Sequence, residues 1–190
     1  KQEAKEQAAD PKKALPKNIS CMEVDQAAAL LKRLAKPERN MLIDLIDNES
    51  KRDIAMLESF DEDEIGSRMS MNFIEIKAGI SIREAMRELV SQAADNDNIS
   101  TLYVTDDKHT FCGAIDLKDL IIAREGTSLD DIIMESYPYV YAREMIEDCI
   151  ERMKDYSEDS IPVLDENNKI LGVITAQDIV QVVDDEMGDD

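Results

Sequence analysis

The sequence predicts an α/β (α+β) fold in which two copies of a β-α-β-β-α repeat follow a short all-α acidic segment. Residues 102–123 (LYVTDDKHTFCGAIDLKDLIIA) align without a gap with residues 161–182 (IPVLDENNKILGVITAQDIVQV), at a constant offset of 59 residues. Each copy begins with an apolar strand and a polar turn, and a second apolar strand then leads into a helix. Because each sheet has one face that it cannot cover alone, we expect the two copies to pack on each other.

The first half of each repeat is also duplicated, at an offset of 64 residues. In the first copy, a strand at 72–76 (NFIEI) is followed by Ser81 and Glu84, whose capping-box spacing predicts the start of a helix. In the second copy, a strand at 137–141 (YPYVY) is followed by a helix from about Ile146. The smaller offset in the second half places about five extra residues in a loop of the first copy.

The segment before the repeats has a helical pattern. Residues 1–20 are polar and predict a tail or a mobile helix, whereas apolar residues recur at helical spacing from Cys21 to about Phe60. Pro37 suits the first turn of one short helix, and Asn48 can cap the next. The predicted boundaries are 1–20 for the tail, 21–64 for the helical segment, 65–126 and 127–183 for the two repeats, and 184–190 for the start of an acidic exit helix.

The charge balance restricts the partners. The chain carries 43 acidic against 22 basic residues, so its formal net charge is −21. Such a surface disfavours nucleic acid and anionic lipid and favours cations. No apolar run in the sequence approaches the roughly 18 to 20 residues of a membrane span.

The residues needed for common enzyme or zinc chemistry are missing from the sequence. Its one histidine, His109, lies in a turn that we predict to be exposed, and no Ser/His/Asp set, Walker loop or HExxH motif occurs. We therefore do not expect an enzyme. Cys21, Cys112 and Cys149 have no metal-site spacing, and we interpret them as reduced core thiols of a cytosolic protein.

The predicted exit helix carries a stripe of carboxylates. If residues 176–189 form one helix, Asp178, Asp185 and Asp189 fall within about 40° of one another around its axis, with Glu186 at the edge of that face. Carboxylates some 8 Å apart repel each other by roughly 1 kcal/mol at an intermediate dielectric. A divalent cation relieves this repulsion, and Mg²⁺ suits the stripe because it keeps several waters and needs only one or two carboxylates. A solvated acidic helix without an ion is the alternative.

Taken together, these segments resemble a known family. The two repeats resemble a cystathionine-β-synthase (CBS) domain pair, which is a regulatory module. Residues 26–190 are similar to the cytosolic region of bacterial MgtE-type magnesium transporters, because the helical segment, the junction IGSRMS at 65–70, the repeat pair and the acidic exit helix follow in the same order. The helical segment would then be the C-terminal part of an MgtE-type N domain.

The resemblance implies a function and a location. The chain would sense Mg²⁺ on the cytoplasmic side of the bacterial inner membrane and form a homodimer through its CBS pair. Its exit helix would be held against its own C-terminal transmembrane domain, which this sequence does not contain. Bound Mg²⁺, placed at acidic interfaces between subdomains or dimer partners, would favour the closed pore.

Metal ligands are implied in the same way. Gln181 and Ser157 stand where the family often has carboxylates, so fewer or weaker ions should bind. The residues that align with metal-facing positions of the family are Asp178, Glu186, Asp189 and Glu147. Asp185, which lies on the same predicted helix face as Asp178 and Asp189, completes the set of candidate ligands.

Adenine nucleotide is the second candidate ligand. CBS domains that bind it resemble one another in the motif G-h-h-[ST]-x-x-D, which residues 172–178 (GVITAQD) match fully. Residues 113–119 (GAIDLKD) carry Asp116 in place of the hydroxyl residue, and this carboxylate would repel phosphate. The lining that the resemblance implies consists of Lys118, Asp119, Tyr137, Pro162, Thr175 and Asp178.

Two alternatives remain open at this point. Thr175 with Asp178 three residues later is also a simple helix cap at a strand-to-helix turn. If nucleotide is the main ligand, the chain is a free-standing CBS-pair module that senses ATP, ADP or AMP and controls a partner by contact. If neither ligand binds, the chain is an interaction scaffold.

Overall fold

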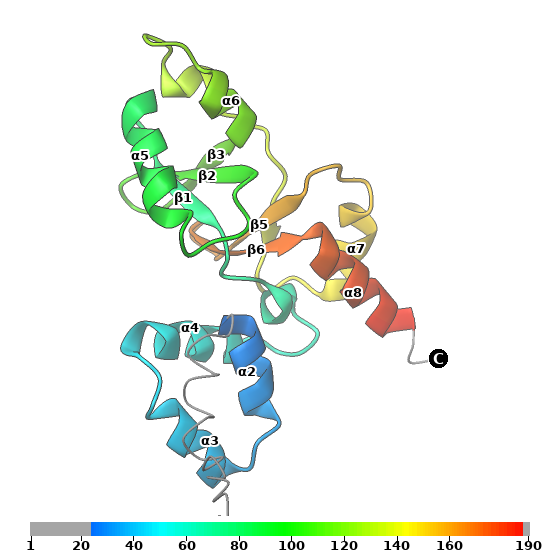
Figure 1. The fold of residues 1–190 in the computed structure, drawn as a ribbon. Coiled ribbons are helices and arrows are strands. Elements are labelled where there is room, and N and C mark those ends of the chain that lie inside the picture. The colour runs from blue at the N-terminus through cyan, green and yellow to red at the C-terminus, as the bar shows by residue number, and fades with distance from the viewer. Residues whose placement is uncertain (1–23, 188–190) are drawn as a thin grey trace, which may run out of the picture. The chain divides into compact units, whose positions relative to one another are not determined.

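The computed structural model describes residues 24–187 and divides the chain into two compact units, Lys1–Met56 and Leu57–Asp190. Figure 1 shows the helices of the first unit and the two sheets of the second. The second unit contains two three-stranded sheets of matching topology, so the predicted α/β fold with a tandem repeat is confirmed. Within residues 24–187, no helix is both long and apolar enough to cross a membrane.

The first unit is helical. Its elements are α2 (Val24–Lys32), α3 (Lys36–Ile43) and α4 (Asn48–Glu58), the last of which runs on into the second unit. Pro37 lies in the first turn of α3, as predicted. The predicted cap of α4 is wrong by one residue, because Asp47 takes that place: its carboxylate accepts hydrogen bonds from the backbone N–H groups of Glu49 and Ser50 at 3.0 and 2.9 Å.

A short junction leads from α4 to the first repeat and packs on the second repeat. Residues Ile65–Arg68 form a 3-10 helix, η1, within the IGSRMS segment. The N–H of Ile65, which is fully buried, donates to the carbonyl of Glu144 at 2.9 Å. Ser70 and Val173 exchange two backbone hydrogen bonds of 2.8 and 2.9 Å. The junction therefore forms hydrogen bonds with the second repeat, although it directly precedes the first repeat in the sequence.

The first repeat packs two helices on a three-stranded sheet (Figure 1). Its elements are β1 (Ile74–Lys77), α5 (Ile82–Gln92), β2 (Thr101–Thr105), β3 (Phe111–Asp116) and α6 (Leu117–Ile122), and the 3-10 helix η2 (Leu129–Ile132) then leads into the second repeat. The strand order is β1-β2-β3, with β1 parallel and β3 antiparallel to β2. The predicted capping box is confirmed, because Ser81 and Glu84 exchange hydrogen bonds of 3.2 and 2.9 Å at the start of α5.

The second repeat has the same order. Its elements are β4 (Val140–Tyr141), α7 (Ile146–Met153), β5 (Ser160–Leu164), β6 (Ile170–Thr175) and α8 (Ala176–Met187). The strand predicted at 137–141 is too long, since only its last two residues pair. Pro138 has no N–H for a ladder, and the hydroxyl of Tyr137 donates instead to the carbonyl of Ser160 at 2.7 Å. α8 crosses the predicted boundary at 183/184 without a break.

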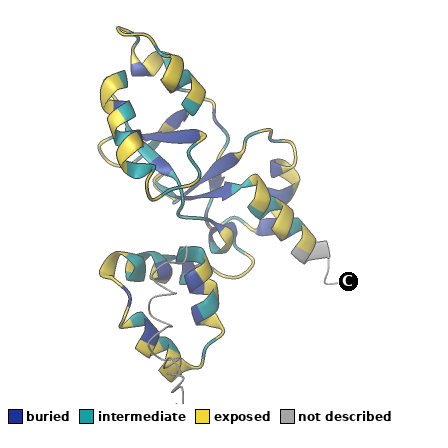
Figure 2. Cartoon of the chain, in the orientation of Figure 1, coloured by how far each residue is buried: buried dark blue, intermediate teal, exposed yellow. Residues whose placement is uncertain are grey.

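The two repeats exchange segments symmetrically. Ser70, in the entry segment upstream of β1, pairs with Val173 in β6, and Met134, in the entry to the second repeat, pairs with Ala114 in β3. The Met134 and Ala114 bonds measure 2.7 and 3.1 Å. The exchanged segments pair with β3 and β6, and the three central residues of each of these strands are buried (Figure 2). The buried cluster that joins the repeats consists of Tyr103, Ala114, Tyr137 and Val173.

Candidate functional site

The exit helix begins at a closed hydrogen-bonded cap. The hydroxyl of Thr175 donates to Oδ2 of Asp178 at 2.7 Å, and the same oxygen accepts from the Thr175 N–H at 2.8 Å. The N–H of Asp178 donates to the Thr175 hydroxyl oxygen at 3.2 Å. The capping role that was one alternative for these two residues is thus present. It uses one carboxylate oxygen of Asp178 and fixes the direction in which α8 leaves the sheet.

The predicted metal ligands that fall within the described residues lie on two helices that pack on each other, α7 and α8 (Figure 1). Asp178 is half-buried in the first turn of α8, and Glu147 is exposed in the first turn of α7. Asp185 and Glu186 fall within α8, whereas Asp189 lies outside the described residues.

No preformed cage exists among the side chains that the structure describes. Within that part of the chain, no group of three or more His, Cys, Asp or Glu residues is placed to hold a metal ion. The donors present, Asp178 and the exposed Glu147, are hard oxygen ligands of the kind that Mg²⁺ binds through one or two carboxylates while it keeps its waters. The residues present therefore fit a hydrated ion rather than one enclosed by protein.

The predicted nucleotide residues fall into two groups. Lys118 and Asp119 lie at the start of α6, and Thr175 and Asp178 lie at the start of α8. The strand residues next to these helix starts are Thr101, which pairs with Asp116, and Ser160, which pairs with Thr175.

Tyr137 and Pro162 are instead part of the buried boundary between the repeats. Tyr137 is only 8% exposed, and Pro162 is buried within β5. Burial raises the pKa of Tyr137 above its usual range, while a hydrogen bond with Thr101 opposes this change. Its hydroxyl also donates to the carbonyl of Ser160, so Tyr137 connects β2 and β5. The antiparallel partners of these two strands, β3 and β6, lead into α6 and α8. The structure thus brings Tyr137 close to both helix starts.

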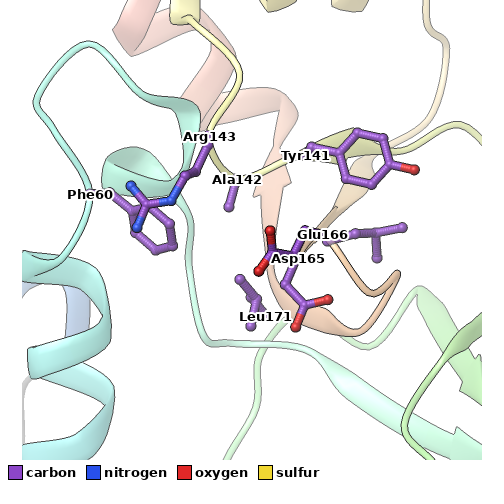
Figure 3. Close-up of a pocket in the computed structure, with 8 residues that line it drawn as sticks. Phe60, Tyr141, Ala142, Arg143, Asp165, Glu166 and Leu171 are labelled. Atoms are coloured by element: carbon purple, nitrogen blue, oxygen red, sulfur yellow. The ribbon is translucent and has the colours of Figure 1, made fainter.

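A pocket of about 350 Å³, which the sequence reasoning missed, opens at the carboxyl ends of the parallel strands β4 and β5. Figure 3 shows Phe60 and Arg143 on one side of it and Tyr141 on the other, with the carboxylates of Asp165 and Glu166 between them. The full lining is Phe60, Tyr141, Ala142, Arg143, Leu164, Asp165, Glu166 and Leu171. The available signal was the position of polar side chains directly after two neighbouring parallel strands.

Predictions for the cysteines and for His109 have mixed outcomes. Cys149 is buried, and its burial, aided by the nearby carboxylate of Glu144, raises its pKa to about 12, so this thiol is unreactive. Cys112 is exposed, so its assignment to the core is wrong: β3 is irregular at this point and turns the side chain outward. Cys21 lies outside the described residues. His109 is exposed, as predicted.

The CBS-domain family matches residues 63–126 and 129–185 of the chain. Among curated relatives, the magnesium transporter MgtE of Thermus thermophilus is 30% identical over 149 residues, which is 78% of this chain and 33% of the relative. MgtE of Enterococcus faecalis is 32% identical over 143 residues, which is 75% of this chain and 32% of the relative. The chain therefore spans about a third of the length of these relatives.

Solved structures give the same result. The soluble part of a magnesium transporter has a TM-score of 0.84 and 31% identity, over 90% of this chain and 67% of that chain. The cytosolic domain of the Mg²⁺ channel MgtE in complex with ATP has a TM-score of 0.84 and 28% identity, over 90% of this chain and 71% of that chain. The chain belongs to the CBS-domain family, and it is homologous to the cytosolic region of the MgtE magnesium transporters.

Proposed function

We propose that the chain is the regulatory region of an MgtE-type magnesium transporter and that it senses Mg²⁺. The observation that carries the proposal is its likeness to the soluble part of a magnesium transporter over 90% of the chain. In this proposal the region acts on the cytoplasmic side of the bacterial membrane, and its own transmembrane domain is the partner that it gates. It carries out no catalysis.

The sensing step depends on the carboxylates of α7 and α8. Without a divalent ion, the acidic side chains of the two packed helices and of a second copy repel one another. A hydrated Mg²⁺ held by Asp178 and Glu147, with Asp185, Glu186 and Asp189 farther along the chain, offsets that repulsion. The compact state that results sets the direction of the exit helix, which leads toward the pore.

Homodimerisation through the CBS pair is part of the proposal, and exposed apolar side chains support it. Ile121 on α6 and Val180 on α8 are 62% and 60% exposed and occupy equivalent positions in the two repeats. Val90 on α5 and Ile122 on α6 are further apolar side chains that are more than 60% exposed. A single copy leaves these side chains in water, whereas a second copy would cover them.

A thermal unfolding experiment tests Mg²⁺ sensing. One site with a millimolar dissociation constant should add about 1.4 kcal/mol at ~10 mM Mg²⁺. The unfolding midpoint of a chain of this size should then rise by roughly 3 to 5 °C relative to NaCl of the same ionic strength. The double variant Glu147→Gln and Asp178→Asn should lose most of this shift, whereas Asp107→Asn, in an exposed turn of the first repeat, should keep it.

Equal midpoints in Mg²⁺ and NaCl would rule out the sensing proposal. Sedimentation in the same two buffers tests the dimer: the wild type should sediment as a dimer, and Ile121→Asp with Val180→Asp as a monomer. A monomeric wild type at micromolar concentration would contradict dimerisation through the CBS pair.

A second candidate function, adenine nucleotide binding, is supported by the relative whose structure is in complex with ATP. The lining would include Lys118 and Asp119, with Tyr137 between the strands. Pro162 is buried, and the Thr175 hydroxyl already donates to Asp178, so the second motif would have to exchange this bond for one to the ligand. Calorimetry with ATP, ADP and AMP tests it: Lys118→Ala should weaken binding, and no heat from any of the three nucleotides would exclude it.

A further inference from the structure

The pocket beside Phe60 combines apolar walls with an excess of negative charge. Phe60, Leu164, Leu171 and the ring of Tyr141 form most of its surface. Asp165 and Glu166 contribute carboxylates, and Arg143 contributes the only cation among the lining residues. Its volume, about 350 Å³, is within the range of small-molecule sites. None of the proposed metal or nucleotide residues lines it, so it is separate from both of those functions.

The positive charge of Arg143 is already compensated. Its Nη1 lies 3.0 Å from Oε2 and 3.2 Å from Oε1 of Glu64. Its guanidinium carbon lies 5.1 Å from the centre of the Phe60 ring, in a cation–π contact. Glu64 does not line the pocket, and its carboxylate is paired with Arg143, so it is not available to a ligand. An anionic ligand would have to displace this carboxylate.

The two lining carboxylates are not compensated in the same way. Oδ1 of Asp165 accepts hydrogen bonds from the N–H groups of Asn167 and Lys169 at 2.8 and 2.9 Å, which leaves Oδ2 for a ligand. Glu166 is exposed beside it. The pocket therefore offers carboxylate oxygens at its edge and apolar surface farther in.

We propose that this pocket binds an organic cation in which a primary ammonium group is carried on an apolar chain. The ammonium would bind Asp165 and Glu166, and the chain would lie against Leu171 and the ring of Tyr141. A bare hydrated Mg²⁺ would gain nothing from these apolar walls, and a polyphosphate would be repelled by the two carboxylates. Free diamines and the lysine side chain of a partner protein share the required chemistry.

The first repeat supplies a matched control. Asp106 and Asp107 occupy the same turn positions as Asp165 and Glu166, and Oδ1 of Asp106 accepts two N–H bonds of 2.8 and 2.9 Å, as Oδ1 of Asp165 does. The pair Asp165→Asn with Glu166→Gln and the pair Asp106→Asn with Asp107→Asn thus remove the same two charges from equivalent turns. In both pairs the asparagine keeps the acceptor that the turn needs.

The test is an NMR titration of the chain with cadaverine at fixed ionic strength. We expect resonances of the pocket to shift and the pair at 165 and 166 to weaken binding about fivefold, whereas the control pair should change it less than about twofold. Circular dichroism melts establish that each variant is folded. Equal weakening by the two pairs would overturn the proposal, because the diamine would then respond to net charge alone. An ammonium ion that binds as tightly as cadaverine would also overturn it.

A second arm separates the two sources of the cation. Nα-acetyl-lysine amide replaces cadaverine in the same titration. Tighter binding of the lysine derivative would support a side chain of a partner protein as the occupant, and tighter binding of cadaverine would support a free diamine. Failure of both probes to shift pocket resonances would overturn the proposal and would leave Mg²⁺ sensing, which depends on other residues, unaffected.

Discussion

The turns that join the last two strands of each repeat have the same backbone and different chemistry. His109 and Asn168 occupy equivalent positions, and both are left-handed, with φ of 62° and 60°. In the first repeat, Nζ of Lys77 lies 3.2 Å from Nδ1 of His109. In the second, the hydroxyl of Tyr141, which is equivalent to Lys77, donates to Oδ1 of Asn168 at 2.8 Å. The same contact is made by a cation in one repeat and by a neutral phenol in the other.

The positions next to this contact are also charged in the first repeat and uncharged in the second. Glu75 accepts a hydrogen bond from Thr105 and lies 2.9 Å from His109, so the first repeat has a charged network here. The equivalents of Glu75 and Thr105 are Tyr139 and Leu164, and the ring of Tyr139 packs edge-on against that of Tyr141 at 5.5 Å. Backbone geometry is therefore common to the repeats, whereas the side chains at these strand ends are charged in the first repeat and mainly aromatic or aliphatic in the second.

The largest expected effect concerns a feature that the repeats share. A Cβ on Gly172 would lie 2.7 Å from the carbonyl oxygen of Ser70, and one on Gly113 would lie 2.6 Å from that of Met134. Both clashes are with backbone of the exchanged segments, which cannot move away without loss of the pairing. Gly172→Ala and Gly113→Ala should each lower the free energy of unfolding by about 2 to 4 kcal/mol, measured by urea denaturation.

Gly126→Ala is the control for these variants. A Cβ on Gly126 would meet nothing within 4 Å, but its φ is +94°, so the cost should be limited to about 1 kcal/mol of backbone strain. If Gly113→Ala or Gly172→Ala lowers the free energy of unfolding no more than Gly126→Ala does, the pairing of the exchanged segments is not rigid. Unequal costs at Gly113 and Gly172 would show that the two repeats do not share it equally.

Tyr103 provides the next test, because its equivalent in the second repeat, Pro162, has no hydroxyl. The Tyr103 hydroxyl is fully buried and hydrogen-bonds the Ser160 hydroxyl, and its burial raises its pKa well above the usual range. Tyr103→Phe keeps the ring contacts and leaves Ser160 without this partner. We expect a loss of about 1 to 2 kcal/mol in urea denaturation. Ser160→Ala in the Tyr103→Phe background should cost little more, and a full additional loss would contradict the pairing.

Most of the fold follows from the sequence, because the signals are local or repeated. The overlay of residues 102–123 on 161–182 predicts both hairpins, and the Ser81 and Glu84 spacing predicts the start of α5 correctly. The exchange of Ser70 and Met134 between repeats was not predictable, since it depends on contacts between segments distant in the chain. For the same reason the burial of Tyr137 and Pro162 and the pocket beside Phe60 could not be deduced from spacing.

A pH experiment sharpens the contrast between the charged cluster and the tyrosines. Burial alone would raise the pKa of Glu75, but hydrogen bonds from Thr105 and His109 and the charge of Lys77 lower it below its ordinary value of 4.5. A carboxyl whose pKa is lower in the folded state stabilises the protein above about pH 4.5, and this contribution is lost as the pH falls through the folded pKa.

Glu75→Gln should therefore lower the free energy of unfolding by about 0.5 to 1 kcal/mol at pH 7 and by close to nothing at a pH below the folded pKa of Glu75. Urea denaturation at these two pH values measures the difference. The amide still accepts from Thr105, so the difference isolates the charge. Tyr139→Phe at the equivalent position should show no such dependence. A cost for Glu75→Gln that is the same at both pH values would contradict an electrostatic role for the cluster.

The smallest expected effect concerns Arg143, whose equivalent in the first repeat is Gly79, a residue without a side chain. Arg143 reaches Glu64 and the Phe60 ring, but its own side chain is 65% exposed. Arg143→Met keeps much of the contact with Phe60 and removes the charge, so the free energy of unfolding should fall by about 0.5 kcal/mol or less at low salt. The difference should vanish at 1 M NaCl, where such a pair is screened. A loss above about 1.5 kcal/mol that persists in high salt would mean that the arginine holds the junction by packing rather than by charge.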